Sequence, residues 1–112
     1  MILIRIAPLP TLHARMTQEA RSDLVTSIRA SIHGPLPRRP YAVAVDLFGR
    51  WNDSKGRPLE RNTDNVVKCI LDVIAEAAGF GRNGRGDQFL DRTLTIRATH
   101  TDGTDMAMVT LI

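Results

Sequence analysis

Apolar residues recur along this chain at two kinds of spacing. Alternation and clusters of β-branched residues predict strands at 2–6, 41–48, 90–98 and 106–112, whereas a repeat of about four residues predicts helices at 17–32 and 64–78. Gly79 follows the second helix at a position where glycine commonly ends one. The predicted order of elements is therefore β-α-β-α-β-β.

This order is typical of a small α/β fold. We expect a two-layer sandwich in which a mixed sheet carries two helices on one face, within a single domain that covers residues 1–112. The Asp102-Gly103 turn predicts that the last two strands form an antiparallel hairpin. Because two helices on one face leave the other face of the sheet bare, the fold also predicts a homodimer.

Composition narrows the class of protein. The chain has 112 residues, of which 43% are hydrophobic and 4% aromatic, so we expect one aliphatic core and little base stacking on aromatic side chains. A single cysteine, Cys69, excludes an internal disulfide framework and a multi-cysteine metal site. No stretch approaches the ~20 apolar residues of a membrane span. We expect a cytoplasmic protein with no membrane partner and no small-molecule cofactor.

The charged residues suggest a phosphate-bearing partner. Fifteen Lys and Arg outnumber twelve Asp and Glu for a net charge of +3, and nearly all the cations are arginine, which binds phosphate through its two-pronged guanidinium. Four arginines lie in the connectors that flank the second helix, and we take them as candidate DNA contacts: Arg57, Arg61, Arg82 and Arg85. An ordinary solvated surface is the alternative interpretation.

The start of the second helix carries the candidate chemistry. Asp64 and Lys68 are one helical turn apart, so both can point into one site, and Asp87 follows after a glycine-rich loop. Carboxylates are the ligands that Mg²⁺ prefers, and a nearby lysine offsets charge on a phosphate under attack. The alternative is structural: Asn62 and Asp64 suit a helix N-terminus, and Asp64, Lys68 and Asp72 suit a solvated ladder of ion pairs.

Four short motifs carry a family resemblance. The run RNTDNVVK at 61–68, Leu-Asp at 71–72, Ala-Gly-Phe at 78–80 and Gly-Asp-Gln at 86–88 resemble the RusA-type Holliday junction resolvases. The resemblance implies a homodimer that binds four-way DNA junctions and cuts two strands symmetrically, with Mg²⁺ or Mn²⁺ as cofactor. It implies Asp64, Lys68 and Asp87 as catalytic residues, and Asp64, Asp87 and Asn62 as metal ligands.

Two alternatives stay open, the first of them because of a departure from the family pattern. Asn62 stands where the family has its first aspartate, so a ligand charge is missing unless Glu60 replaces it. One alternative is therefore a catalytically weakened relative that still binds branched DNA. The other is a basic dimeric interaction module without enzymatic activity, in which the acidic residues only cap a helix.

Overall fold

The computed structural model describes residues 1–10, 12–81 and 86–112, except for the side chains at 86 and 87. Its elements are β1 (Ile2–Ile6), α1 (Gln18–Ser31), β2 (Tyr41–Gly49), α2 (Thr63–Ala77), the short 3-10 helix η1 (Gly86–Phe89), β3 (Leu90–His100) and β4 (Met106–Leu111). The small α/β fold with four strands and two longer helices is confirmed, with ends that differ from the predicted ones by two residues at most.

The four strands form one mixed sheet in the order β1-β4-β2-β3. β4 runs antiparallel to both of its neighbours, and β3 runs parallel to β2. The predicted hairpin of the last two strands is wrong, because β4 inserts between β1 and β2 and is separated from β3 by β2. The alternate residues Ala107, Val109 and Leu111 of β4 are fully buried, which requires the helix-covered centre of the sheet.

Local signals explain where the two helices begin and end. α1 starts at Thr17, whose hydroxyl accepts a hydrogen bond from the backbone N–H of Ala20 at 3.1 Å. α2 ends in a Schellman motif, in which the N–H of Gly79 donates to Glu76 and that of Phe80 donates to Ala75. Gly79 has a φ of +86°, a backbone conformation that glycine adopts without strain.

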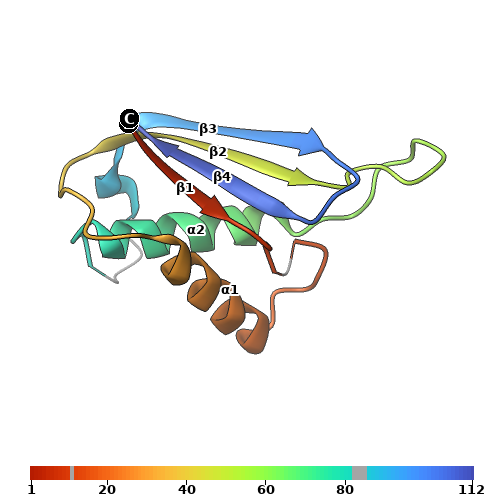
Figure 1. The fold of residues 1–112 in the computed structure, drawn as a ribbon, viewed down its shortest axis with the longest axis horizontal. Coiled ribbons are helices and arrows are strands. Elements are labelled where there is room, and N and C mark those ends of the chain that lie inside the picture. The colour runs from red at the N-terminus through yellow and green to blue at the C-terminus, as the bar shows by residue number, and fades with distance from the viewer. Residues whose placement is uncertain (11, 82–85) are drawn as a thin grey trace.

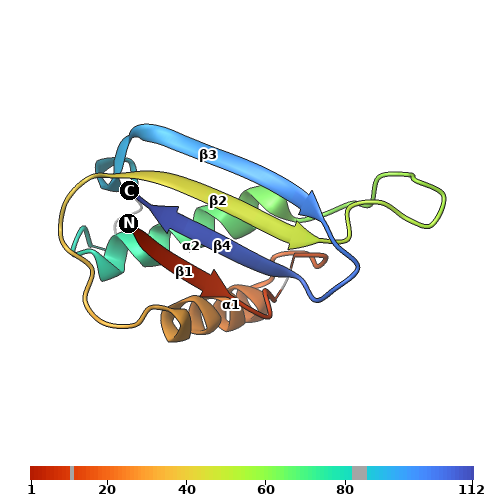
Figure 2. The same cartoon turned by 45° about the horizontal axis from the view of Figure 1, so that its top comes forward.

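Both helices pack on the same face of the sheet, so the molecule has two layers (Figures 1 and 2). The core lies between the layers, and its largest fully buried side chains are Tyr41, Phe89, Ile6, Leu12, Leu24, Ile28, Leu47, Ile70, Ile74 and Leu111. The opposite face of the sheet is open. There Ala44, Phe48, Met108 and Thr110 line a shallow hollow of about 410 Å³.

The edge strand β3 is only partly covered by the helix layer. Its residues Leu94 and Ile96 are paired with Val43 and Val45 of β2 and therefore face the helices. The two valines are 2% and 1% exposed, whereas Leu94 is 39% and Ile96 is 51% exposed. Early in β3 the register shifts, and Arg92 adopts a φ of +54° there, as is usual at a bulge.

Polar contacts on the open face attach β3 to the rest of the sheet. Asp46 of β2 accepts hydrogen bonds from the guanidinium of Arg97 at 2.7 and 3.0 Å and from the hydroxyl of Thr99 at 2.9 Å. The indole N–H of Trp51 donates to the carbonyl of Thr99 at 2.9 Å. These contacts hold the second half of β3, where apolar packing against the helices is weak.

Candidate functional site

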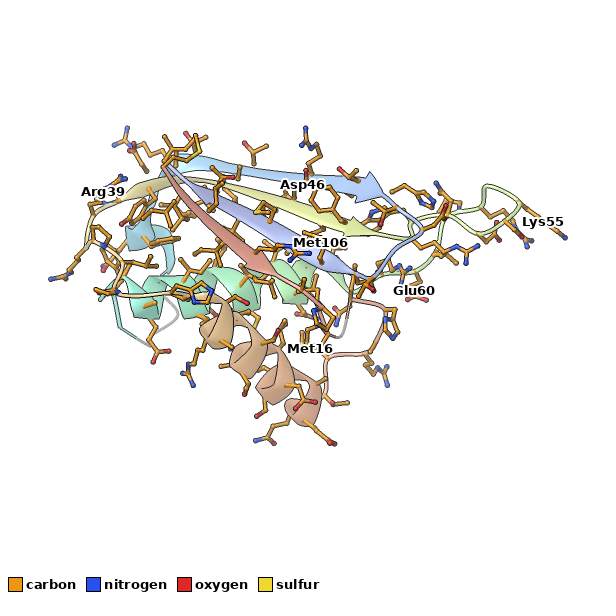
Figure 3. The ribbon with its side chains drawn as sticks, viewed as in Figure 1. Met16, Arg39, Asp46, Lys55, Glu60 and Met106 are labelled. Atoms are coloured by element: carbon orange, nitrogen blue, oxygen red, sulfur yellow. The ribbon has the colours of Figure 1, made fainter. Side chains whose placement is uncertain are left out.

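The N-terminal end of α2 borders a polar hollow of about 380 Å³ that opens to solvent. The hollow is formed by the segment after β1 and the segment before α2, and it is lined by His13, Ala14, Arg15, Met16, Glu60, Arg61, Asn62 and Asn65. Figure 3 shows Glu60 near the body of the domain, while Lys55 lies at the far tip of the loop that joins β2 to α2. Three residues of the motif at 61–68 therefore line this hollow: Arg61, Asn62 and Asn65.

Asn62 holds the two walls of this hollow together. Its backbone N–H donates to Leu12 at 2.7 Å, and its side-chain amide donates to the carbonyl of Ala14 at 2.9 Å. Its amide oxygen accepts a hydrogen bond from the side chain of Asn65 at 3.1 Å. Asn62 is the N-cap residue of α2 but does not cap it with its side chain. The amide therefore has a structural role, because a carboxylate cannot donate to Ala14.

Asp64 and Lys68 lie in the first two turns of α2, and both are exposed. Farther along α2, Asp72 and Glu76 continue the same four-residue spacing as a polar stripe, and both contact α1. Asp72 lies 3.9 Å from the guanidinium of Arg21, and Glu76 lies 3.3 Å from that of Arg29. The expected ladder of ion pairs along α2 is therefore, in its second half, a set of contacts between the two helices. Asp64 and Lys68 belong to the half of the stripe that extends beyond these contacts.

The backbone of Asp87 lies beyond the opposite end of α2. Its backbone is part of η1, and its side chain is outside the described residues. Phe89, the last residue of η1, packs against Phe80 just beyond the C-terminus of α2, with ring centroids 6.2 Å apart. A helix of 15 residues is about 22 Å long. One chain therefore does not bring the backbone at 87 close to Asp64.

The candidate DNA-binding arginines that the structure describes both have protein partners. Arg57 lies in the loop between β2 and α2 and donates to the carboxylate of Asp53 at 2.9 Å. Arg61 donates through its guanidinium to the backbone carbonyl of Arg50, with 2.8 Å for the Nε contact. Arg82 and Arg85 lie outside the described residues. Arg57 remains 70% exposed at its side chain and can still reach a phosphate.

Asp53 organises the tip of the same loop. Its carboxylate accepts hydrogen bonds from the backbone N–H groups of Lys55 and Arg57, both at 2.9 Å. The bond from the Arg57 backbone is the main reason why the pKa of Asp53 is below its usual value. The loop is therefore a folded turn, with Trp51 at its base bonded to β3.

Sequence reasoning did not anticipate His13 and Arg15 at this site. Their positions give no signal, because the segment that carries them is about 50 residues away from the motif and is brought there by Asn62. His13 lies 3.4 Å from the carboxylate of Asp105, in the connection between β3 and β4. The hollow is thus formed by a segment near the N-terminus and one from the middle of the chain, and its residue His13 also contacts the connection before β4.

Three further side chains behave as packing residues. Cys69 is buried inside α2, and burial raises the pKa of its thiol, which agrees with an inert thiol. Phe80 packs edge-to-face with Phe89, and the guanidinium carbon of Arg38 lies over its ring, 5.5 Å from the ring centroid. Trp51 is likewise half-buried, with its indole N–H bonded to the backbone.

The described part of the chain contains no group of three or more His, Cys, Asp or Glu that could hold a metal ion. Among the same residues, no helix is long and apolar enough to cross a membrane. Comparison of the chain with models of protein families, with curated proteins and with solved structures finds no match.

Proposed function

We propose that this protein is a metal-dependent, structure-selective endodeoxyribonuclease of the RusA type, which acts as a homodimer on four-way DNA junctions. The observation that carries the proposal is the position of the motif at 61–68. Asp64 is exposed in the first turn of α2, next to the polar hollow that Glu60, Arg15 and Arg61 line. Acidic oxygen donors near arginine side chains suit a cation and a phosphodiester at the same place.

The separation of the two ends of α2 favours a site made by two chains. Asp64 lies at the start of α2, and the backbone of Asp87 lies in η1, next to its end. A cation that both residues bind must therefore have the start of α2 in one copy next to η1 of the other. A two-fold axis would form two such sites, which suits paired and symmetric incisions.

The candidate ligands are carboxylates, which are the kind of ligand that a magnesium or manganese ion binds. Asp64 of one chain and Asp87 of the second would hold it, and Glu60 supplies the negative charge that Asn62 lacks. When bound, the ion would make a water nucleophilic and stabilise the leaving oxygen. Lys68, one turn along α2 from Asp64, offsets negative charge on the phosphate. Arg57 and Arg61 hold the DNA backbone, with Arg82 and Arg85 as further candidates.

The contacts of Asn62 favour a second candidate function. Its amide donates to Ala14 and accepts from Asn65, so it acts as a tether between segments rather than as a free ligand. A chain that has replaced a ligand with a tether would bind branched DNA and cut it weakly. Metal-dependent activity separates this candidate from the first, because both predict binding to junctions.

The test is cleavage of a labelled synthetic four-way junction with Mg²⁺, with Mn²⁺ and with EDTA, beside a linear duplex. We expect paired cuts on the junction alone, lost in EDTA. In the variant Asp64→Asn we expect cleavage to fall by at least about 100-fold while junction binding is retained, because a ligand charge is removed at unchanged shape. The control is Asp23→Asn, the same change at an exposed position of α1. Binding without cuts would support the second candidate, and neither binding nor cuts would refute both.

A further inference from the structure

We propose that the outer edge of β3 is the contact between two copies of this chain, joined as antiparallel strands about a two-fold axis at Thr95. The proposal rests on the proposed function for the number of copies. The length of β3, its exposed side chains and its charge distribution each favour this contact.

The outer edge of β3 is long and carries little charge. The strand has 11 residues, against 5 in β1, and in the described part of the chain no strand pairs with its outer side. Edge strands of monomers are commonly short or carry lysine or proline, which discourage pairing with another chain. Between Thr93 and Thr99 the only charged residue is Arg97, and Asp46 of the same chain already neutralises it. The bulge at Arg92 confines pairing to the residues that follow.

The exposed apolar residues of β3 complement each other under two-fold symmetry. Leu94 and Ile96 flank Thr95, and both are exposed on the helix-facing side of β3. An axis at Thr95 puts Leu94 of one copy opposite Ile96 of the second copy, and the reverse, so the two pairs cover each other. It also puts Arg97 opposite Thr93, so no like charges meet. A second copy therefore supplies the same exposed residues in the matching register.

The resulting dimer has a shape that agrees with the proposed function. Antiparallel pairing about this axis extends the two sheets into one of eight strands, with the helices of both copies on the same face. β3 is parallel to β2, so His100 lies at the end of the sheet where the chain leaves for α2 (Figure 1). Antiparallel pairing places Leu90 of the second copy, and η1 just before it, at that end. The proposed function requires η1 of one copy near the start of α2 in the other, and this pairing puts both at the same end of the extended sheet.

A disulfide across the axis tests the contact directly. In an antiparallel pair the Cα atoms of facing residues are about 4.5–5.5 Å apart, within the range of a disulfide. Under mild oxidation, we expect Thr95→Cys to give a covalent dimer of twice the 12.4 kDa chain mass on a non-reducing gel. The matched control is Leu3→Cys, at a 61% exposed position on the other edge strand. The unaltered chain, whose Cys69 is buried, controls for the native thiol.

A dimer that is specific to Thr95→Cys supports the proposal, and equal or absent cross-linking in the two variants overturns it. Sedimentation gives a second and independent measurement. We expect Ile96→Lys to convert a species of twice the chain mass to a monomer, and Leu3→Lys to leave the dimer intact. A monomeric unaltered chain, or a dimer that survives Ile96→Lys, overturns the proposed contact.

The junction assay separates this proposal from the proposed function. If Thr95→Cys cross-links through β3 but the unaltered dimer neither binds nor cuts four-way junctions, the contact is supported and the proposed function fails. If the unaltered chain cuts junctions in pairs but Thr95→Cys does not cross-link, the nuclease is supported and the β3 contact fails.

Discussion

The two edges of the sheet have the same alternation of apolar residues but opposite surroundings. In β1, the residues Ile4 and Ile6 face the helices and are 2% and 0% exposed. In β3, Leu94 and Ile96 face the same side of the sheet and are 39% and 51% exposed. The difference arises because helix packing covers one edge and not the other. Alternation therefore identifies the side of the sheet on which a residue lies, but not whether anything covers it.

The largest expected effect comes from comparing Ile4→Ala with Ile96→Ala. Ile4→Ala leaves a cavity in a packed core and should lower the free energy of unfolding by about 3 kcal/mol. Ile96→Ala should lower it by less than about 1 kcal/mol in the monomer, because the side chain is already half in water. Urea unfolding, at a protein concentration where sedimentation shows monomers, measures both. Equal losses would mean that the two edges do not differ in packing.

The next effect concerns the polar contacts that hold β3 in place of helix packing. Asp46→Ala removes the acceptor of the hydrogen bonds from Arg97 and Thr99, which measure 2.7–3.0 Å. It should lower the free energy of unfolding by about 1–2 kcal/mol. Amide exchange should become faster along β3 and stay unchanged along β1. Arg5→Ala, on the exposed side of β1, is the control and should be nearly neutral. Faster exchange throughout the sheet would show that Asp46 stabilises the whole fold rather than this edge.

The third expected effect concerns the segment that follows β1. The segment after β1 is fastened to α2 by Asn62, and Asn62→Asp removes the N–H that donates to Ala14. We expect a loss of about 1 kcal/mol in unfolding free energy. The same variant introduces the charge that the RusA-type resolvases have at the matching position, so under the proposed function we expect Mn²⁺ affinity or junction cleavage to rise.

Asn52→Asp, the same change at an exposed loop position, should alter neither quantity. Lower stability without higher metal affinity would assign Asn62 to structure alone. Higher metal affinity at unchanged stability would show that its hydrogen bond to Ala14 contributes little.

The sequence was sufficient to predict all four strands, both longer helices and the end of α2 at Gly79, because these follow from local spacing and local conformation. The strand order was not predictable from a turn signal. The Asp102-Gly103 turn reverses the chain, but burial of Ala107, Val109 and Leu111 decides where the next strand inserts. Turn residues fix a change of direction, whereas the neighbour of a strand depends on which part of the sheet the helices cover.

The candidate site was predictable only in its local half. Spacing correctly placed Asp64 and Lys68 on successive exposed turns of α2. The tether from Asn62 to Ala14 and the position of His13 depend on a segment about 50 residues away, for which no local pattern exists. The separation of Asp64 from η1 likewise follows from the length of α2 and the packing of Phe89, not from the motif.

The smallest expected effect depends on pH and concerns the loop that meets β3 through Trp51. Hydrogen bonds from the backbone of Arg57 and Lys55 lower the pKa of Asp53 in the folded state. Because the folded-state pKa lies below the unfolded value of about 3.9, the stabilisation is present above that pH and is lost as pH falls through the folded-state pKa.

We therefore expect the amide resonances of Lys55 and Arg57 to shift together in acid, and the Asp53→Asn variant to shift far less over the same range. The carboxylate of Asp53 bonds to Lys55 and Arg57 of its own loop, so the resonances of β1 and β2 should not follow this titration. If the resonances of β3 move with those of the loop, the bond from Trp51 to Thr99 couples this edge of the sheet to the loop. If they do not, β3 is held by Asp46 and its pairing with β2, and the loop is independent of it.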